Sequence, residues 1–202
     1  DHLSTLIRDL EQPDIVRATA LDLIRSYREP APAARLPALK DKSPLVRSSA
    51  VRGLEFLDPQ IKLKHLAPLL DDRFRTVRME AARVLSTMPV DELLSEHRDS
   101  FRSALQEFTD GQKWLADMPA SHLNLGFLEE AKGALTQAET SYRRSLEMDP
   151  AFLPAYVNLA NLYNRQARNG EADIQPIWLT VDDEDPNEAS ILVLTDGASS
   201  KY

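Results

Sequence analysis

Three segments of the chain repeat the same spacing of residues, and this repetition constrains the fold more than any other feature. Each segment has an acid, then a valine five residues later, an arginine six later and an alanine nine later. The arginines are Arg17, Arg47 and Arg78, so the period is 30 and then 31 residues. Such a period indicates a repeat protein, in which each unit buries its apolar face against its neighbours.

Each copy has the features of the second helix in a helix pair. Pro13 and Pro44 suit the first turn of a helix, where a missing N–H costs nothing, and Ser43 is a possible N-cap. Apolar residues follow at helical spacing in all three copies. The upstream partner helices are predicted at Leu3–Leu10, Ala33–Leu39 and Ile61–Leu70.

This pattern resembles short HEAT repeats, so residues 1–90 are predicted to be HEAT-like. In that family an acid and an arginine six residues apart form a ladder between neighbouring repeats. Two interpretations of the arginines are possible, a ligand-binding row and an inter-repeat ladder. The ladder is favoured because the acids recur in register with the arginines. The matching pairs are Glu11/Arg17, Asp41/Arg47 and Asp72/Arg78.

A connecting segment follows over residues 91–118. Asp91–Leu94 and Arg98–Phe108 have helical periodicity, and the dipeptide Asp110-Gly111 predicts a turn. One or two helices are therefore expected between the two repeat systems.

A second repeat begins near Pro119 with a period of 34 residues. It resembles tetratricopeptide repeats over residues 119–170. That family has small residues where two helices cross, an aromatic four residues after the second of them, and a proline that begins the next pair. The matching residues are Gly126, Ala138, Tyr142 and Pro150 in the first copy, and Ala160 and Ala172 in the second.

Residues 171–202 depart from this repeat. Pro176 stands where the family has an aromatic residue, inside the expected second helix, and proline breaks a helix interior. Ile177–Val181 and Ile191–Thr195 are β-prone, with the acidic run Asp182–Asp185 between them. An atypical cap, a β-hairpin and a loosely held tail all remain open, and we interpret the acidic run as an exposed turn.

Composition excludes several classes of function. The net charge of -8 argues against a general nucleic-acid binder, which needs a basic face. The absence of cysteine excludes disulfides, thiolate metal sites and haem attachment within these residues. There is no apolar run long enough for a membrane span. The first residue, Asp1, is not methionine, so we expect a processed chain or a piece of a longer one.

No catalytic constellation, phosphate loop or metal-ligand spacing occurs in the sequence, so we expect neither an enzyme nor a cofactor. The resemblance to tetratricopeptide repeats instead implies a concave surface that binds a peptide. In that family an asparagine at the position of Asn124 and Asn158 can bond a peptide backbone. The alternative is that these amides only face water. The predicted binding residues are Asn124, Phe127, Asn158, Asn161 and Arg165.

HEAT-like repeats that lead into tetratricopeptide repeats also resemble the C-terminal region of bacterial multihaem c-type cytochromes. The segments that carry this resemblance are Gln12–Ala20, Leu69–Asp72 with Val77–Arg78 and Glu80–Ala82, and His122–Gly126. It implies an extracytoplasmic protein, with a cytoplasmic one as the alternative, that packs against a c-type cytochrome. A similarity of the HEAT-like block to repeats in bilin lyases gives an enzyme as a third hypothesis, but no reactive group is placed for it.

Together these patterns predict an all-α, right-handed superhelical solenoid with an irregular or short β tail. The predicted function is a non-catalytic scaffold that binds a protein or peptide. The alternative is an accessory or assembly domain of a multihaem c-type cytochrome in electron transfer.

Overall fold

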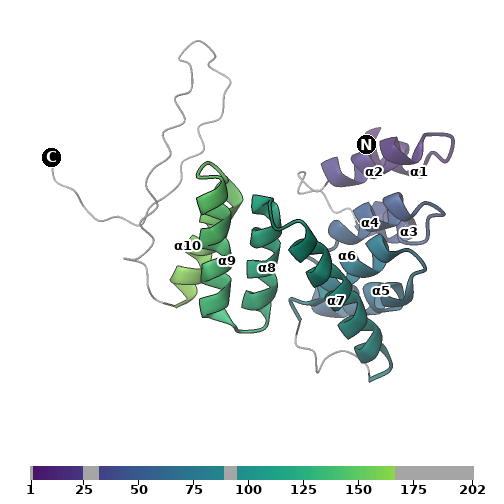
Figure 1. Cartoon of the computed structure of the whole chain (residues 1–202). Coiled ribbons are helices and arrows are strands. Elements are labelled where there is room, and N and C mark those ends of the chain that lie inside the picture. The colour runs from purple at the N-terminus through teal and green to yellow at the C-terminus, as the bar shows by residue number, and fades with distance from the viewer. Residues whose placement is uncertain (1, 25–31, 89–94, 167–202) are drawn as a thin grey trace, which may run out of the picture. The chain divides into compact units, whose positions relative to one another are not determined.

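The computed structural model describes residues 2–24, 32–88 and 95–166. These residues form ten α-helices and two short 3-10 helices, and the described part contains no strand (Figure 1). The all-α prediction is therefore confirmed for the described residues. The predicted tail, residues 171–202, lies outside them. The chain divides after Trp114 into two compact units.

The first unit is built from helix pairs in series. The second helix of each pair packs on the second helix of the next, α2 on α4 and α4 on α6, and α7 then packs on α6 (Figure 1). The pairs are α1 (His2–Arg8) with α2 (Asp14–Leu23), α3 (Pro32–Ala38) with α4 (Pro44–Arg52), and α5 (Pro59–Leu66) with α6 (Arg75–Leu85). Helix α5 continues into η1 (Ala67–Asp71), and η3 (Ser95–His97) leads into α7 (Arg98–Trp114).

Helix α4 shows why these residues form a buried helix. Pro44 occupies its first turn, and Ser43 is the N-cap residue, although its side chain makes no cap hydrogen bond. Val46, Ala50 and Leu54 are inaccessible to solvent. They share one face at helical spacing, so burial of this face stabilises the helix between its neighbours.

The turn predicted at Asp110-Gly111 is wrong, because α7 continues through both residues to Trp114. A glycine inside a helix costs only about 1 kcal/mol relative to alanine, which tertiary packing can offset. Here the residues that come before the glycine in α7 include three that are buried on one face, Phe101, Ala104 and Phe108. Their burial extends the helix past a residue that locally favours a turn.

The second unit contains α8 (Pro119–Ala131), α9 (Leu135–Met148) and α10 (Leu153–Arg165). Gly133, between α8 and α9, has a φ of 75°, a left-handed conformation that favours glycine. The core lies between α9 and α10, and its buried residues are Ala138, Tyr142, Leu159, Leu162 and Tyr163.

Candidate functional site

The repeated arginines form ion pairs that run from one repeat to the next. Arg47 donates from Nε to Asp72 Oδ2 and from Nη2 to Asp72 Oδ1, each at 2.8 Å. Its Nη1 also donates to the carbonyl oxygen of Asp41 at 2.7 Å. Both side chains of the Arg47–Asp72 pair are nine-tenths buried. The pair is therefore bidentate and largely dry, which is the strongest geometry for an arginine and a carboxylate.

The same arrangement occurs on either side of this pair. Arg17 binds Asp41 of the following repeat through Nη1 and also binds Asp14 at 2.7 Å. Arg78 donates from Nη2 to both carboxylate oxygens of Glu107, at 2.7 and 2.9 Å. Glu107 lies in α7, outside the three repeats, so the sequence pattern did not indicate it. In each case the arginine of one repeat binds an acid of the next element.

Hydrogen bonds also hold the acids at the start of each second helix. Asp41 Oδ1 accepts the N–H of Ser43 at 2.9 Å, and Asp72 Oδ1 accepts the N–H of Phe74 at 2.8 Å. Burial alone would raise the pKa of Asp72, but the hydrogen bonds from Arg47 and Phe74 hold it below its ordinary value. The carboxylate is thus held ionised where it joins two repeats.

Glu11 differs from the other predicted acids. It is exposed, and the structure does not bring its carboxylate to Arg17. The acid with the geometry of Asp41 and Asp72 is Asp9, whose Oδ1 accepts the N–H of Glu11 at 3.1 Å. The loop before α2 places the turn-forming acid two residues earlier than the repeat pattern predicts.

A second set of basic residues lies at the opposite ends of the second helices, and sequence reasoning missed it. Arg35 donates to the carbonyl oxygens of Ile24 and Gly53, at 3.0 and 2.9 Å, which are the C-cap residues of α2 and α4. Lys62 lies 3.4 Å from both the carbonyl oxygen of Glu55 and the hydroxyl of Thr87. A cation beside helix C-termini interacts favourably with the last carbonyl groups. Because Arg35 and Lys62 are 27 residues apart, the 30–31-residue period gave no signal for them.

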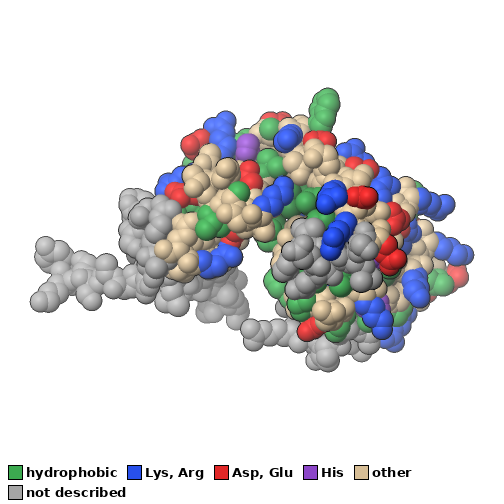
Figure 2. Space-filling view, turned by 90° about the horizontal axis from the view of Figure 1, so that it is seen from below, with side chains coloured by type: hydrophobic (Ala, Val, Ile, Leu, Met, Phe, Trp, Pro, Cys, Tyr) green, Lys and Arg blue, Asp and Glu red, His purple; other side chains and the backbone are tan. Residues whose placement is uncertain are grey.

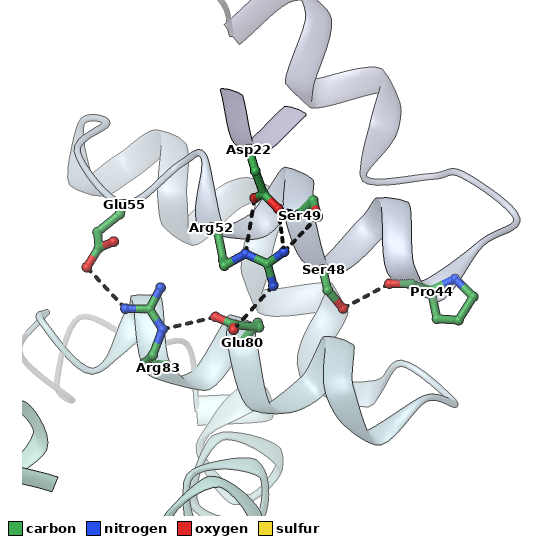
Figure 3. Close-up of polar contacts among 8 residues, drawn as sticks. All are labelled: Asp22, Pro44, Ser48, Ser49, Arg52, Glu55, Glu80 and Arg83. Atoms are coloured by element: carbon green, nitrogen blue, oxygen red, sulfur yellow. Dashed lines mark hydrogen bonds and ion pairs between the residues drawn. The ribbon is translucent and has the colours of Figure 1, made fainter. Parts of the chain in front are cut away.

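A third network joins the second helices along their length (Figure 3). Arg52 of α4 binds Asp22 of α2 at 3.0 Å and Glu80 of α6 at 3.6 Å. Arg83 binds Glu80 and Glu55 at 2.9 and 3.1 Å. Although burial disfavours the charged form of Arg83, these two carboxylates raise its pKa. The repeated arginines Arg17, Arg47 and Arg78 are likewise bound by carboxylates of the chain, which disfavours their use as a ligand-binding row.

The predicted peptide-binding residues lie on α8 and α10 of the second unit. Asn158, Asn161 and Arg165 recur at i, i+3 and i+7 and so share one face of α10. Asn161 and Arg165 are exposed and Asn158 is half-buried. Asn124 and Phe127 of α8 are also half-buried. The five residues are accessible to different extents, and none of them belongs to the core.

An ion pair connects these two helices. Arg165 Nη2 binds Glu130 of α8, and the same carboxylate accepts the hydroxyl of Tyr142 at 2.6 Å. The Glu130 side chain is only 9% exposed, whereas that of Arg165 is 64% exposed. Arg165 therefore neutralises a buried acid of the chain while part of its side chain faces solvent.

Helices α8 and α9 cross closely at a glycine. A Cβ atom added to Gly126 would lie 2.6 Å from the ring of Tyr142 and 3.1 Å from the carbonyl oxygen of Ala138. Tyr142 is fully buried, and its burial together with the nearby charge of Glu129 raises its pKa. Glu129, which stands where a large residue is usual in tetratricopeptide repeats, instead accepts the hydroxyl of Ser141 at 2.7 Å. Only glycine fits this crossing without moving the tyrosine.

A similar polar contact joins α9 to α10. The hydroxyl of Tyr163 donates to Glu139 Oε1 at 2.7 Å, and Arg143 donates to the Tyr163 oxygen at 2.6 Å. Burial of the ring and the hydrogen bond to Glu139 raise the pKa of Tyr163. Tyrosine hydroxyls bonded to glutamates thus link α9 to α8 and to α10.

The described residues contain no group of three or more histidine, aspartate or glutamate side chains that could hold a metal ion. His122 instead lies with Nε2 2.9 Å from the carbonyl oxygen of Ala116. Among the described helices, none is both long and apolar enough to cross a membrane.

Comparisons with known proteins identify the repeats of the first unit. No curated protein and no solved structure matches the chain. A family model described as HEAT repeats matches residues 1–86. This range covers α1 to α6, which contain the three arginine-bearing helix pairs. The N-terminal part of the chain is therefore a HEAT-like repeat region.

Proposed function

We propose that this chain is a non-catalytic scaffold that binds a protein or peptide on the surface formed by α8 and α10. The observation that carries the proposal is the hydrogen bonding of the Asn158 and Asn161 side chains. Within the described residues, neither side chain forms a hydrogen bond, although charged and hydroxyl side chains nearby do. Their amide groups are therefore available to a partner.

The arrangement of α8, α9 and α10 supports a tetratricopeptide-type assignment for residues 119–166. The 34-residue period, the glycine crossing at Gly126 and the buried Tyr142 are the features on which this assignment rests. In this proposal the HEAT-like and tetratricopeptide-type pairs belong to a right-handed superhelical solenoid. A concave surface of such a solenoid would be lined by the first helix of each tetratricopeptide-type pair, here α8 and α10.

An extended peptide is the partner that this surface suits best. An amide side chain offers both a donor and an acceptor, so it can bond the N–H and C=O groups of a peptide backbone. Asn158 and Asn161 supply two such groups on one face of α10. Phe127 of α8 adds a partly exposed ring that could contact an apolar side chain of the peptide.

The charged residues support a binding role rather than a catalytic one. The repeated arginines Arg17, Arg47 and Arg78 pair with acids of the chain, and the tyrosines with raised pKa values bond to glutamates that hold helices together. On the face shown in Figure 2, acidic and basic side chains are interspersed, which disfavours a nucleic-acid surface there. The ion pairs of the arginines and the raised pKa values of the tyrosines thus arise from contacts that hold helices together.

The test is a selection of peptides from a random library on the immobilised full-length chain, followed by calorimetric titration. We expect the double variant Asn158→Ala and Asn161→Ala to bind the selected peptides about tenfold more weakly or worse, since two hydrogen bonds are lost. Gln137→Ala, an exposed amide on α9, is the matched control and should leave affinity unchanged. Equal affinity of the double variant and the control would show that the surface is wrongly assigned.

A second candidate rests on the sequence resemblance to multihaem cytochromes. In this version the chain is an accessory or assembly domain that packs against a c-type cytochrome outside the cytoplasm. Capture of a haem-stained c-type cytochrome by the immobilised chain would favour it. If capture persists in the Asn158→Ala and Asn161→Ala double variant, the cytochrome binds elsewhere than the α8–α10 surface.

A further inference from the structure

The two ends of the helix stack in the first unit differ in how the described residues cover them. At the end next to α6, helix α7 buries Phe101, Ala104 and Phe108. It also supplies Glu107, which binds Arg78. Helix α7 therefore contributes both an apolar stripe and the charge that completes the arginine ladder.

The other end, formed by α1 and α2, has an apolar face that the described residues leave accessible. Leu23 of α2 is 51% exposed, and Ile15 is 60% exposed. Together with Leu6, Val16 and Thr19 they line a groove of about 250 Å³. A groove lined almost entirely by apolar side chains is unfavourable in water and suits an apolar partner.

The repeat period shows what kind of element would fill this groove. The positions equivalent to Val16 and Leu23 in α6 are Val77 and Val84, which are fully buried. The position equivalent to Thr19 in α4 is Ser49, which is 1% exposed and bonds to Asp22 of α2. In the later repeats the part of this face equivalent to Val16, Thr19 and Leu23 is thus covered by the second helix of the preceding pair. The position of Ile15 stays exposed there, as Leu45 shows at 41%, so the missing cover concerns Val16, Thr19 and Leu23.

The charges at this end are complementary to an arginine. Asp9 has the same turn geometry as Asp41 and Asp72, which each bind an arginine from the neighbouring helix. Among the described residues, no lysine or arginine pairs with Asp9 or Glu11. Asp9 is bound instead by its own loop, through Gln12 Nε2 at 3.0 Å.

We infer that the α1–α2 face is a stacking face for a partner helix of HEAT type, which brings an apolar stripe to the groove and an arginine to Asp9 and Glu11. This occupant follows from continuity with the α2–α4 and α4–α6 contacts, and from the two acids that no lysine or arginine of the described residues binds. The inference concerns the first unit and does not depend on the peptide surface proposed for α8 and α10.

The test adds such a helix to the full-length chain. Residues 1–30 are duplicated in front of Asp1, so that the added copy supplies an equivalent of α2 with its arginine. We expect amide hydrogen exchange in the original α2 to slow by about tenfold or more, because its exposed face becomes buried. Unchanged exchange in the original α2 would overturn the inference.

Two variants of the duplicated chain separate the apolar contribution from the charged one. Leu23→Glu in the original copy should abolish the added protection, whereas Phe56→Glu, at a site 90% exposed, should retain it. Replacement of the arginine of the added copy by alanine should remove part of the protection. If that replacement has no effect, the partner does not need an arginine and this part of the inference is wrong.

The unmodified chain provides the remaining test, by sedimentation over a wide range of concentrations. We expect it to stay monomeric, since the inferred partner is not a second copy. A dimer that dissociates on Leu23→Glu would overturn the inference, because a second copy would then cover the groove.

Discussion

The two units of this chain join their helices by different means. In the first unit, buried arginines bind acids of the next repeat, as Arg47 binds Asp72. In the second unit, a ring packs on a glycine, as Tyr142 packs on Gly126, and tyrosine hydroxyls bond to glutamates. A bidentate ion pair matches two residues by charge and hydrogen-bond direction, whereas a ring against a glycine fixes how closely two helix backbones approach. The contrast shows that adjacent helical repeats can specify their stacking by charge or by shape.

The largest expected effect comes from breaking the charge-based contact. Arg47→Ala leaves Asp72 buried without its partner, so we expect a loss of about 3 kcal/mol in the free energy of unfolding. Arg102→Ala is the control, because the Arg102–Asp99 pair is exposed on both sides and its loss should be barely measurable. The measurement is denaturant unfolding followed by far-ultraviolet circular dichroism. If the two variants lose equal stability, the Arg47–Asp72 pair is not what holds the repeats.

The shape-based contact is tested by adding one methyl group. Gly126→Ala places a carbon against the Tyr142 ring and should cost about 2 kcal/mol through overpacking. Gly111→Ala in α7 meets only the end of the Met79 side chain, at 3.3 Å, and should be neutral or stabilising because alanine favours helix. The thermal unfolding midpoint should fall for Gly126→Ala and should stay the same or rise for Gly111→Ala. Stabilisation by both would mean that the α8–α9 crossing is not tight.

A smaller effect is expected at the hydroxyl of Tyr142. Tyr142→Phe keeps the ring but removes the hydrogen bond to Glu130, which should cost about 1.5 kcal/mol. Arg165 remains bound to that carboxylate, so the loss should be smaller than for Gly126→Ala. Hydrogen exchange in α8 and α9 should rise, while exchange in α4 should not. A rise in both would show that the effect is not local to the second unit.

The two contacts should also respond to pH in opposite directions. The pKa of Asp72 is lowered in the folded chain, so its contribution is complete above about pH 4 and is lost as the pH falls further. The pKa values of Tyr142 and Tyr163 are raised, so their contribution is complete below about pH 10 and is lost as the pH rises further. We expect Asp72→Asn to flatten the acid side of the stability profile and Tyr142→Phe to flatten the alkaline side. If Asp72→Asn flattened the alkaline side and Tyr142→Phe the acid side, the proposed difference between the two units would be wrong.

The smallest effect is expected in the network of Figure 3. Arg52 and Asp22 are partly exposed, so Arg52→Ala should cost less than about 1 kcal/mol. Added salt should reduce the difference from the unmodified chain, because solvent screens this pair more than the Arg47–Asp72 pair. A cost as large as that of Arg47→Ala would mean that this partly exposed network contributes as much to the stacking of the repeats as the buried pair does.

The sequence by itself determined the helix pairs, because helices depend on local spacing. Val46, Ala50 and Leu54 share a face in any helix that contains them, and the resemblance to tetratricopeptide repeats implies a close helix crossing at Gly126. The candidate binding residues on α10 were likewise placed on one face by spacing alone. Their accessibility, and the attachment of Arg165 to Glu130, were not evident from the sequence.

Only the tertiary structure decided which charged groups meet. Arg17 binds Asp14 and Asp41 rather than Glu11, and Arg35 reaches the ends of two helices without any repeating spacing. These partners lie in different helices, so their distance depends on how the helices stack and not on the local period. Local pattern thus specifies most of the helices, with α7 past Gly111 as an exception that packing decides. The pairing of charges across helices follows from packing between residues far apart in the chain.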